Sequence, residues 1–290
     1  MVKKIVHPSI TKEILRRYDI RLTKRFGQHF LIDENILNKE VQSAGIGSED
    51  LVIEVGAGIG TLTQALAEKA GKVIAVEYDT RFFDVLKDTL SGYDNVEIVR
   101  ADALEVDFDR LIKDKDTALF VANLPYNIAT QVISILLEQT KKIKSMVVMV
   151  QKEVADRITA SPGTKEYGFF TIRTAFFADV SHISVVPRTV FFPPPNVDSS
   201  ILRVVRKPDI HDITSIKDDL FGFIKIFFNE RRKTMGAVIS RRFKDIYGEE
   251  NRQRVTQELT SLGLERSVRA EALTYEQFFR LFCSLRLRQT

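Results

Sequence analysis

Short apolar runs alternate with amphipathic segments between about residues 50 and 150. The runs are typical of buried strands and cover residues 51–55, 72–76, 96–99, 118–122 and 146–150. Helical patterns separate them, for example from Thr61 to Ala70 and from Arg81 to Leu90. Because parallel strands need such crossover connections, this order predicts an α/β fold, a parallel sheet with helices on both faces.

The pattern changes in the last third of the chain. Two β-rich runs within residues 180–206 flank the segment 191–196, where consecutive prolines cannot donate to a sheet ladder. The two runs could form a hairpin that completes the sheet. Beyond Pro208 the pattern is helical, at residues 215–229, 231–246, 251–262 and 274–285. We therefore expect two domains, residues 1–207 and a smaller all-helical domain of residues 208–290.

Charge is distributed unevenly along the chain. Residues 1–30 hold eight Lys and Arg against two acidic residues, and residues 207–290 hold sixteen against twelve. The middle, residues 31–206, is acidic, with nineteen basic residues against twenty-five acidic ones. Basic clusters attract phosphate backbones, so the two ends are candidates for nucleic-acid contacts. Surface Lys and Arg also simply keep proteins in solution, and charge alone does not separate these readings.

Composition argues against several classes of protein. No apolar run approaches the roughly 18 residues that a membrane helix needs, and the N-terminus lacks the apolar core of a signal peptide. One cysteine, Cys283, excludes an intrachain disulfide, and four scattered histidines do not form a zinc cluster. We expect a cytoplasmic protein that acts without a metal ion and as a monomer.

A glycine-rich turn, residues 54–60 (EVGAGIG), joins the first apolar run to the first helical segment. Glu77 stands at the end of the second run, where an acid can accept hydrogen bonds from both ribose hydroxyls. The spacing is not that of a dinucleotide site, because Thr61 occupies the position of the third glycine. A cofactor such as S-adenosylmethionine, which needs no phosphate cradle, suits this turn. Asp102 could accept from the cofactor's adenine amino group or could be a simple turn residue.

The tetrapeptide Asn123-Leu124-Pro125-Tyr126 closes the fourth apolar run. Ligands of open α/β sheets bind outside the carboxyl ends of the strands. The Asn123 amide oxygen and the Leu124 carbonyl could accept the two hydrogens of an exocyclic amino group, while the Tyr126 ring stacks on its base. Asn and Pro also favour turns, so these four residues alone leave a plain strand-end turn open. With the other strand-end residues, they favour methylation of adenine N6.

Further motifs run along the chain: residues 25–31 (RFGQHFL), 123–128 (NLPYNI), 151–155 (QKEVA), 191–199 (FFPPPNVDS) and 231–235 (RRKTM). With these motifs the chain resembles the small-subunit ribosomal RNA adenine N6,N6-dimethyltransferases of the KsgA type over nearly its whole length. The resemblance implies a Rossmann-like class I methyltransferase sheet and S-adenosylmethionine as cofactor. It also implies dimethylation of two adjacent adenines in the 3′-terminal hairpin loop of small-subunit rRNA, during ribosome assembly.

The resemblance also assigns roles to residues. Cofactor contacts fall on His29, Leu31, Gly56, Glu77, Asp102 and Asn123. From the chemistry of the side chains, we expect the target base to be held by Asn123 and Leu124 and to stack on Tyr126 and Phe191, with Phe192 as the alternative to Phe191. From the charge clusters, we expect RNA, either free or in a pre-30S-type particle, to contact Arg25, Arg231, Arg232 and Lys233. We expect the last three to begin a helix that also carries Arg241 and Arg242.

Two other functions remain open at this point. A large-subunit rRNA adenine methylase shares the fold and the tetrapeptide, although it usually lacks this proline loop and the Arg-Arg-Lys pattern. A non-catalytic RNA-binding assembly or transcription factor could use the same scaffold. The presence of Gly56, Glu77 and Asn123 favours an enzyme over that second alternative.

Overall fold

The computed structural model describes residues 4–20, 28–113, 115–208, 213 and 215–285. The chain divides into two compact units. Unit 1 comprises Met1–Ala155 and Ala178–Arg206, and unit 2 comprises Asp156–Phe177 and Lys207–Thr290. Each unit has a hydrophobic core of its own.

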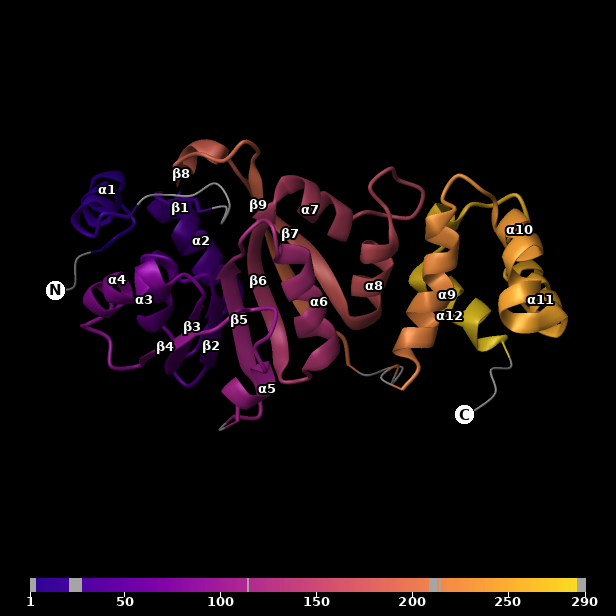
Figure 1. Ribbon diagram of the computed structural model, residues 1–290, viewed down its shortest axis with the longest axis horizontal. Coiled ribbons are helices and arrows are strands. Elements are labelled where there is room, and N and C mark those ends of the chain that lie inside the picture. The colour runs from indigo at the N-terminus through magenta and orange to yellow at the C-terminus, as the bar shows by residue number, and fades with distance from the viewer. Residues whose placement is uncertain (1–3, 21–27, 114, 209–212, 214, 286–290) are drawn as a thin grey trace. The chain divides into compact units, whose positions relative to one another are not determined.

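Unit 1 is built on a seven-stranded sheet in the order β4-β3-β2-β5-β6-β9-β7 (Figure 1). Its strands are β2 (Leu51–Val55), β3 (Lys72–Glu77), β4 (Val96–Arg100), β5 (Ala118–Asn123), β6 (Ile143–Gln151), β7 (Ala178–Val186) and β9 (Ser199–Arg206). Strands β2 to β6 pair in parallel, whereas β9 pairs antiparallel with both β6 and β7. The predicted Rossmann-like sheet is therefore confirmed, and the two β-rich runs form the expected hairpin, with β7 at the sheet edge.

Helices cover both faces of this sheet. They are α1 (Pro8–Arg17), α2 (Glu34–Ala44), α3 (Thr61–Ala67), α4 (Phe83–Thr89), α5 (Phe108–Leu111) and α6 (Ala129–Gln139), with α7 (Lys152–Ile158) at the boundary of the unit. Side chains of a strand alternate between faces, so neighbouring residues of β5 enter different cores. Val121 packs with the apolar residues of α2 and α3, whereas Phe120 contacts Phe108 of α5 edge to face. Helix α2 begins at the capping side chain of Asp33, which accepts from the Ile36 amide.

A second, two-stranded sheet brings distant parts of unit 1 together. Strand β1 (Phe30–Leu31) pairs antiparallel with β8 (Phe191–Phe192), in the register Phe30↔Phe192 and Leu31↔Phe191. The Ile32 amide continues the ladder by donating to the Val190 carbonyl at 2.9 Å. We call this pair the β1–β8 ribbon. It places residues 30–31 beside residues 191–192, which directly precede the three consecutive prolines.

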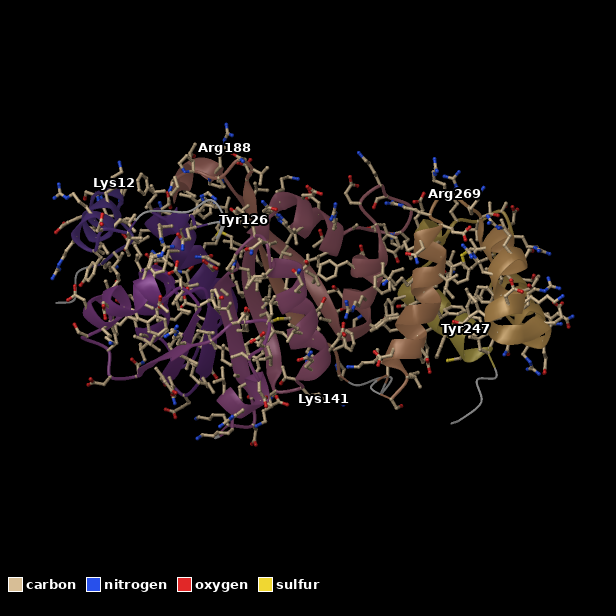
Figure 2. All side chains as sticks on the ribbon, viewed as in Figure 1. Lys12, Tyr126, Lys141, Arg188, Tyr247 and Arg269 are labelled. Atoms are coloured by element: carbon tan, nitrogen blue, oxygen red, sulfur yellow. The ribbon has the colours of Figure 1, made fainter. Side chains whose placement is uncertain are left out.

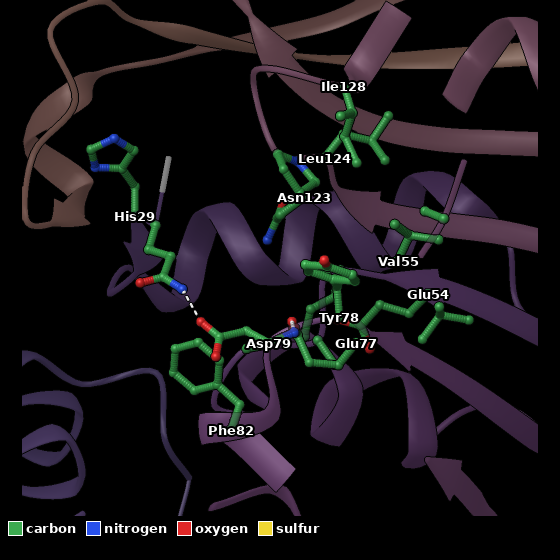
Figure 3. A pocket seen from close by; sticks show the side chains of 18 of the residues that line it. His29, Glu54, Val55, Glu77, Tyr78, Asp79, Phe82, Asn123, Leu124 and Ile128 are labelled. Carbon is green, nitrogen blue, oxygen red and sulfur yellow. Dashed lines mark hydrogen bonds between the residues drawn. The ribbon is translucent and has the colours of Figure 1, made fainter. Parts of the chain in front are cut away.

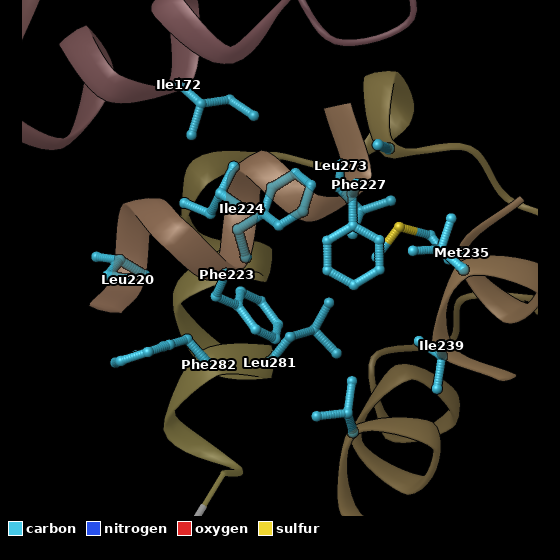
Figure 4. Close-up of a cluster of buried hydrophobic side chains, with 14 of the residues drawn as sticks. Ile172, Leu220, Phe223, Ile224, Phe227, Met235, Ile239, Leu273, Leu281 and Phe282 are labelled. Atoms are coloured by element: carbon cyan, nitrogen blue, oxygen red, sulfur yellow. The ribbon is translucent and has the colours of Figure 1, made fainter. Parts of the chain in front are cut away.

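Unit 2 is helical and has an aromatic core (Figure 4). Its helices are α8 (Phe169–Phe177), α9 (Lys217–Asn229), α10 (Met235–Val238), α11 (Lys244–Ser261) and α12 (Tyr275–Cys283). The fully buried ring of Phe223 packs against Phe227, Phe243 and Phe282, with ring centroids 5.3–5.7 Å apart. Such ring contacts add to the free energy gained by burial alone.

Residues 156–177 group with unit 2, although the sequence analysis assigned residues 1–207 to one domain. The physical reason is the aromatic character of this segment. Tyr167 and Ile172 are buried in the unit 2 core, and the Tyr167 hydroxyl donates to the Leu273 carbonyl at 2.7 Å. The chain therefore leaves unit 1 at Asp156 and returns to it at Ala178, which differs from the predicted single boundary near Pro208.

The expected helix of residues 231–246 begins later than predicted. Residues 231–233 form a turn, and α10 begins at Met235 because the Thr234 hydroxyl accepts from the Ala237 amide and caps it. The helix then passes through a π-helical segment, Ile239–Phe243, into α11. A kink at Gly248, with φ of 83°, separates the two helical patterns that the sequence analysis expected.

Candidate active site

Unit 1 contains a cavity of about 560 Å³ at the carboxyl ends of β2, β3 and β5 (Figure 3). This volume lies within the usual range for small-molecule sites, roughly 300–1,000 Å³. Every residue predicted to contact cofactor or target base lines it: His29, Leu31, Gly56, Glu77, Asp102, Asn123, Leu124, Tyr126 and Phe191. The parallel sheet explains this convergence, because strand ends of one direction meet at one edge.

The glycine turn after β2 lies directly beside the tetrapeptide after β5. Gly56 has φ of 83°, a conformation that favours glycine, and its amide donates to the Val76 carbonyl at 2.8 Å. A Cβ atom on Gly56 would lie 3.4 Å from the Pro125 ring. The backbone of the turn thus forms one wall of the cavity, next to Asn123.

The carboxylate of Glu77 is held by main-chain donors at the end of β3. It accepts from the Gly58 and Asp79 amides, each at 2.8 Å. Burial raises the pKa of Glu77, while these amide bonds oppose the rise. Asp102 accepts from the Leu104 amide at 2.9 Å and so has a turn role in addition to its place in the cavity wall.

Glu54 is a buried acid in the cavity wall, with 2% of its surface exposed. Its Oε2 atom has no hydrogen-bond partner among the described residues. Burial raises the pKa of Glu54 to about 8, and the charge of Glu77 adds to the rise, whereas the Thr63 hydroxyl opposes it. An unpartnered buried carboxyl is costly unless a ligand supplies a donor or a positive charge.

Asn123 ends β5 and is half-buried. Its amide orientation follows from its neighbours, because the two groups it faces on one side are the carboxyl oxygens of Glu40. With the amide N and O exchanged relative to Figure 3, the nitrogen donates to Glu40 Oε1 at 2.9 Å and to Oε2 at 3.1 Å. The amide oxygen is then directed away from Glu40.

Aromatic side chains form another part of the wall. The Tyr126 hydroxyl is hydrogen-bonded to Ser199 Oγ at 2.7 Å, and its ring stacks on His29 with centroids 5.7 Å apart. His29 Nδ1 donates to the Pro193 carbonyl at 2.7 Å, which ties the start of the β1–β8 ribbon to the proline loop. Of the two neighbouring phenylalanines, Phe191 lines the cavity and is also a buried member of the core beside α2 and α3, whereas the partly buried Phe192 packs on the core near α1.

Several residues at this site are not among the positions predicted from the sequence. Tyr78 lines the cavity and is 59% exposed, an unusual position for a large ring. Asp79 accepts from Gln28 Nε2 at 2.8 Å and also pairs with Arg81 (Figure 3). Glu40 was missed too, although a charged residue on the apolar face of a helical segment was a readable signal. Tyr78 and Asp79 directly follow Glu77, so proximity to a strand end would have found them.

The basic residues expected to bind RNA have different surroundings. Arg25 lies outside the described residues. In unit 2, Arg231 donates to Glu271 Oε2 at 2.7 Å and to the Lys165 carbonyl at 2.6 Å, whereas Arg232 and Lys233 are exposed. Glu230 pairs with Arg241 and Arg242. Of the predicted phosphate contacts in unit 2, Arg231 is therefore already hydrogen-bonded within the protein, whereas Arg232 and Lys233 are exposed to solvent.

Two basic residues of unit 1 flank the proline loop (Figure 2). Lys12 of α1 lies with its Nζ 5.0 Å from the centre of the Phe192 ring. Arg188 donates through its backbone amide to Asp198 and through its guanidinium to the Asn196 carbonyl. In the part of the chain that the structure describes, no group of three or more acidic, His or Cys side chains could hold a metal ion. No helix within those same ranges is long and apolar enough to span a bilayer.

Sequence comparison identifies relatives over nearly the whole chain. The family profile described as ribosomal RNA adenine dimethylase matches residues 20–286. A protein of Geobacillus thermodenitrificans named ribosomal RNA small subunit methyltransferase A is 42% identical over 284 residues, covering 96% of each chain. A protein of the same name from Bacillus thuringiensis is 39% identical over 294 residues, covering 99% of each chain.

Solved structures give a consistent result. A dimethyladenosine transferase from Plasmodium falciparum superposes with a TM-score of 0.77 at 28% identity, covering 87% of this chain and 95% of that one. The 23S rRNA methyltransferase ErmE superposes with a TM-score of 0.68 at 27% identity, covering 89% of this chain and all of that one. Fold similarity thus extends to an enzyme named for 23S rRNA, whereas the sequence relatives are named for the small subunit.

Proposed function

Because this chain belongs to the ribosomal RNA adenine dimethylase family, we propose that it transfers methyl groups from S-adenosylmethionine to adenine N6 in small-subunit ribosomal RNA. The finer proposal is that two adjacent adenines of the 3′-terminal hairpin loop become N6,N6-dimethyladenosine. The observation that carries the proposal of methyl transfer is the position of Asn123, at a strand end beside the glycine turn and inside one cavity with Glu54 and Glu77.

The residues of the cavity suit a cationic nucleoside cofactor. Glu77 presents a buried carboxylate, already oriented by two amides, to the ribose hydroxyls. Glu54 Oε2 is buried without a partner among the described residues, which favours a ligand that carries positive charge. The exposed ring of Tyr78 beside Glu77 offers a flat surface for the adenine. When bound, S-adenosylmethionine supplies an electrophilic methyl group on a positively charged sulfur.

The target amine needs help because the N6 lone pair of adenine is delocalised into the ring. In this proposal, Asn123 Oδ1 and the Leu124 carbonyl accept the two N6 hydrogens and favour a more tetrahedral nitrogen. Asn123 and Leu124 would hold the amine while the bound cofactor would supply its methyl group and leave as the neutral sulfide, and the methylated nitrogen would release a proton to solvent. Positioning supplies much of the rate gain, and the oriented acceptor dipoles stabilise the developing positive charge.

The base must leave its stack to reach this cavity. Tyr126 and Phe191 are the proposed stacking partners, and both line the cavity. Base–aromatic stacking is worth roughly 1–3 kcal/mol per base, which is comparable to the cost of unstacking. Relatives named for the small subunit at about 40% identity support this RNA over the large-subunit alternative.

The direct test is a product analysis. The protein is incubated with methyl-labelled cofactor and unmethylated small ribosomal subunits, and the RNA is digested to nucleosides. We expect labelled N6,N6-dimethyladenosine at two molecules per subunit. Subunits that already carry the modification serve as the matched control and should take up no label. Label in large-subunit RNA alone, or no label in either RNA, would contradict the proposal.

A further inference from the structure

A buried carboxyl group lies beneath the proposed catalytic amide. Glu40 belongs to α2 and is fully buried, on the same helix face as the buried side chains of Leu37, Val41 and Ala44. An apolar residue would fill such a position at lower cost, since burying a carboxyl group is unfavourable unless it is paired. The position therefore calls for an explanation beyond packing.

The partner of this carboxyl group is Asn123. Both Glu40 oxygens lie within hydrogen-bond distance of the Asn123 amide nitrogen, at 2.9 and 3.1 Å. We infer that Glu40 is a positioning residue, which holds the Asn123 amide with its nitrogen toward α2 and its oxygen toward the cavity. This inference rests on the proposed function, in which that oxygen accepts a hydrogen from the target amine.

The reason for such a device is the near symmetry of an amide. Its oxygen and nitrogen have similar size, so rotation by half a turn replaces an acceptor with a donor at almost no steric cost. A donor directed at adenine N6 would oppose the required bond. A residue that accepts hydrogen bonds but offers none in its ionised form selects one orientation and excludes the other.

The protonation state of Glu40 determines how strictly it selects the orientation of the amide. Burial raises the pKa of Glu40 well above its usual range, and the charge of Glu54 adds to the rise. A protonated Glu40 keeps a carbonyl oxygen that accepts from the amide nitrogen but gains an O–H donor, so only the ionised form fully excludes the reversed orientation of the amide. Glu40 thus has a different task from Glu54, which lies in the cavity wall with one oxygen unpartnered among the described residues.

The first experiment observes the amide itself. In protein carrying isotopically labelled asparagine, the Asn123 side-chain NH₂ signal is identified by its loss in Asn123→Ala. We expect its protons to exchange slowly in the cofactor-free protein and to become readily exchangeable in Glu40→Leu. Rapid exchange in the wild type would mean that the nitrogen faces the open cavity, and it would overturn the inference.

The second experiment separates positioning from folding. Glu40→Leu removes the acceptor, so we expect kcat to fall on the order of tenfold, with cofactor affinity nearly unchanged and thermal stability equal or higher. Glu40→Gln keeps a carbonyl oxygen at the same reach and should retain more activity than Glu40→Leu. Val41→Ala, one residue away in the same core, is the matched control and should lose stability while keeping kcat.

Further outcomes decide between the two proposals. In the Asn123→Ala background, Glu40→Leu should cause no additional loss, because Glu40 acts through that amide. An additive loss, or equal losses in Glu40→Gln and Glu40→Leu, would overturn the positioning role. A protected Asn123 amide in a wild-type protein that methylates no RNA would contradict the proposed function while supporting the Glu40–Asn123 contact.

Discussion

Unit 1 buries carboxyl groups where its strands end, whereas unit 2 buries aromatic rings. Glu40, Glu54 and Glu77 are at most 7% exposed, and burial raises the pKa of each. Among the described residues of unit 2, none of the buried side chains is charged. Its acids lie nearer the surface, where Glu230 has a lowered pKa because Arg242 donates to it.

The contrast separates two uses of polar groups. In unit 2, the ion pairs lie near the surface, where their charges stay in contact with water, and they contribute little to stability. In unit 1, the buried acids are costly to bury. Glu54 and Glu77 line one cavity and Glu40 contacts Asn123 in its wall, a combination typical of functional sites. Substitutions in either unit test this contrast.

Removing a core ring should destabilise unit 2 without affecting the cavity. Phe223→Ala leaves a void among Phe227, Phe243 and Phe282, so we expect a loss of about 3–5 kcal/mol in unfolding free energy. Denaturant unfolding measures this loss, and calorimetry measures cofactor affinity, which should not change. Phe228→Ala, at a half-buried ring, is the control and should cost less. Lost cofactor affinity in Phe223→Ala would break the contrast.

Removing the amide at the strand end should affect chemistry and leave folding intact. Asn123→Ala deletes the proposed acceptor for adenine N6, so we expect kcat to fall by about 10²–10³-fold. Single-turnover transfer to unmethylated small subunits measures this rate. Cofactor affinity and thermal stability should change far less. Wild-type turnover in this variant would show that the amide does not hold the amine.

The pH dependence of cofactor binding should report on Glu54. Below its pKa of about 8 this carboxyl is neutral, and a cationic cofactor favours the ionised form. We therefore expect affinity to rise by up to about tenfold per pH unit toward pH 8 and to level off above it. Glu54→Gln should flatten this profile. A steep profile that persists in Glu54→Gln would assign the proton to another group.

The raised pKa of Glu54 also makes the stability of the cofactor-free protein depend on pH. The folded state keeps a proton on Glu54 up to about pH 8, whereas the unfolded chain releases it near the ordinary value of 4.5. The stabilisation from this proton is complete below pH 4.5 and is lost as the pH rises toward 8. Thermal unfolding across this range should show a declining midpoint, with a shallower decline in Glu54→Gln.

The exposed cations of the Arg-Arg-Lys turn should give the smallest effects. Arg232 and Lys233 are exposed, so replacing either with Ser should lower the salt slope of RNA binding by about 1. Arg231 already donates to Glu271, so Arg231→Ala should cost stability more than it changes the slope. Binding titrations at several salt concentrations measure the slopes. Slopes that stay at the wild-type value would remove this turn from the RNA interface.

The sheet was predictable because buried parallel strands appear as continuous apolar runs, and each run from residues 51–55 to 146–150 became a strand. The residues at the ends of these strands could be predicted to lie together, because parallel strands end at the same edge of the sheet. The helix start at Met235 could not be read from charge, because a single capping hydroxyl at Thr234 determines it. The excursion of residues 156–177 into unit 2 depends on tertiary contacts that no local pattern contains.

The roles of single residues at the site were less predictable. The choice between Phe191 and Phe192 depends on the register of a two-residue strand, which is too short to show a period. Glu40 is an acid on an apolar face, but its partner is more than eighty residues away in sequence. The spacing of residues in a sequence predicts which side chains share one helix, one strand or one sheet edge. It does not predict that a side chain of a helix packed on the sheet, such as Glu40 of α2, contacts a residue at a strand end.

The β1–β8 ribbon has a consequence for how such a protein can change over time. Its paired residues alternate between two environments, so a slip by one residue would exchange Phe191 for Phe192 at the cavity wall. Because β8 holds phenylalanine at both positions, such a slip would still place a phenyl ring at the cavity wall. The aromatic wall of the site is therefore insensitive to the gain or loss of one amino acid in a neighbouring loop.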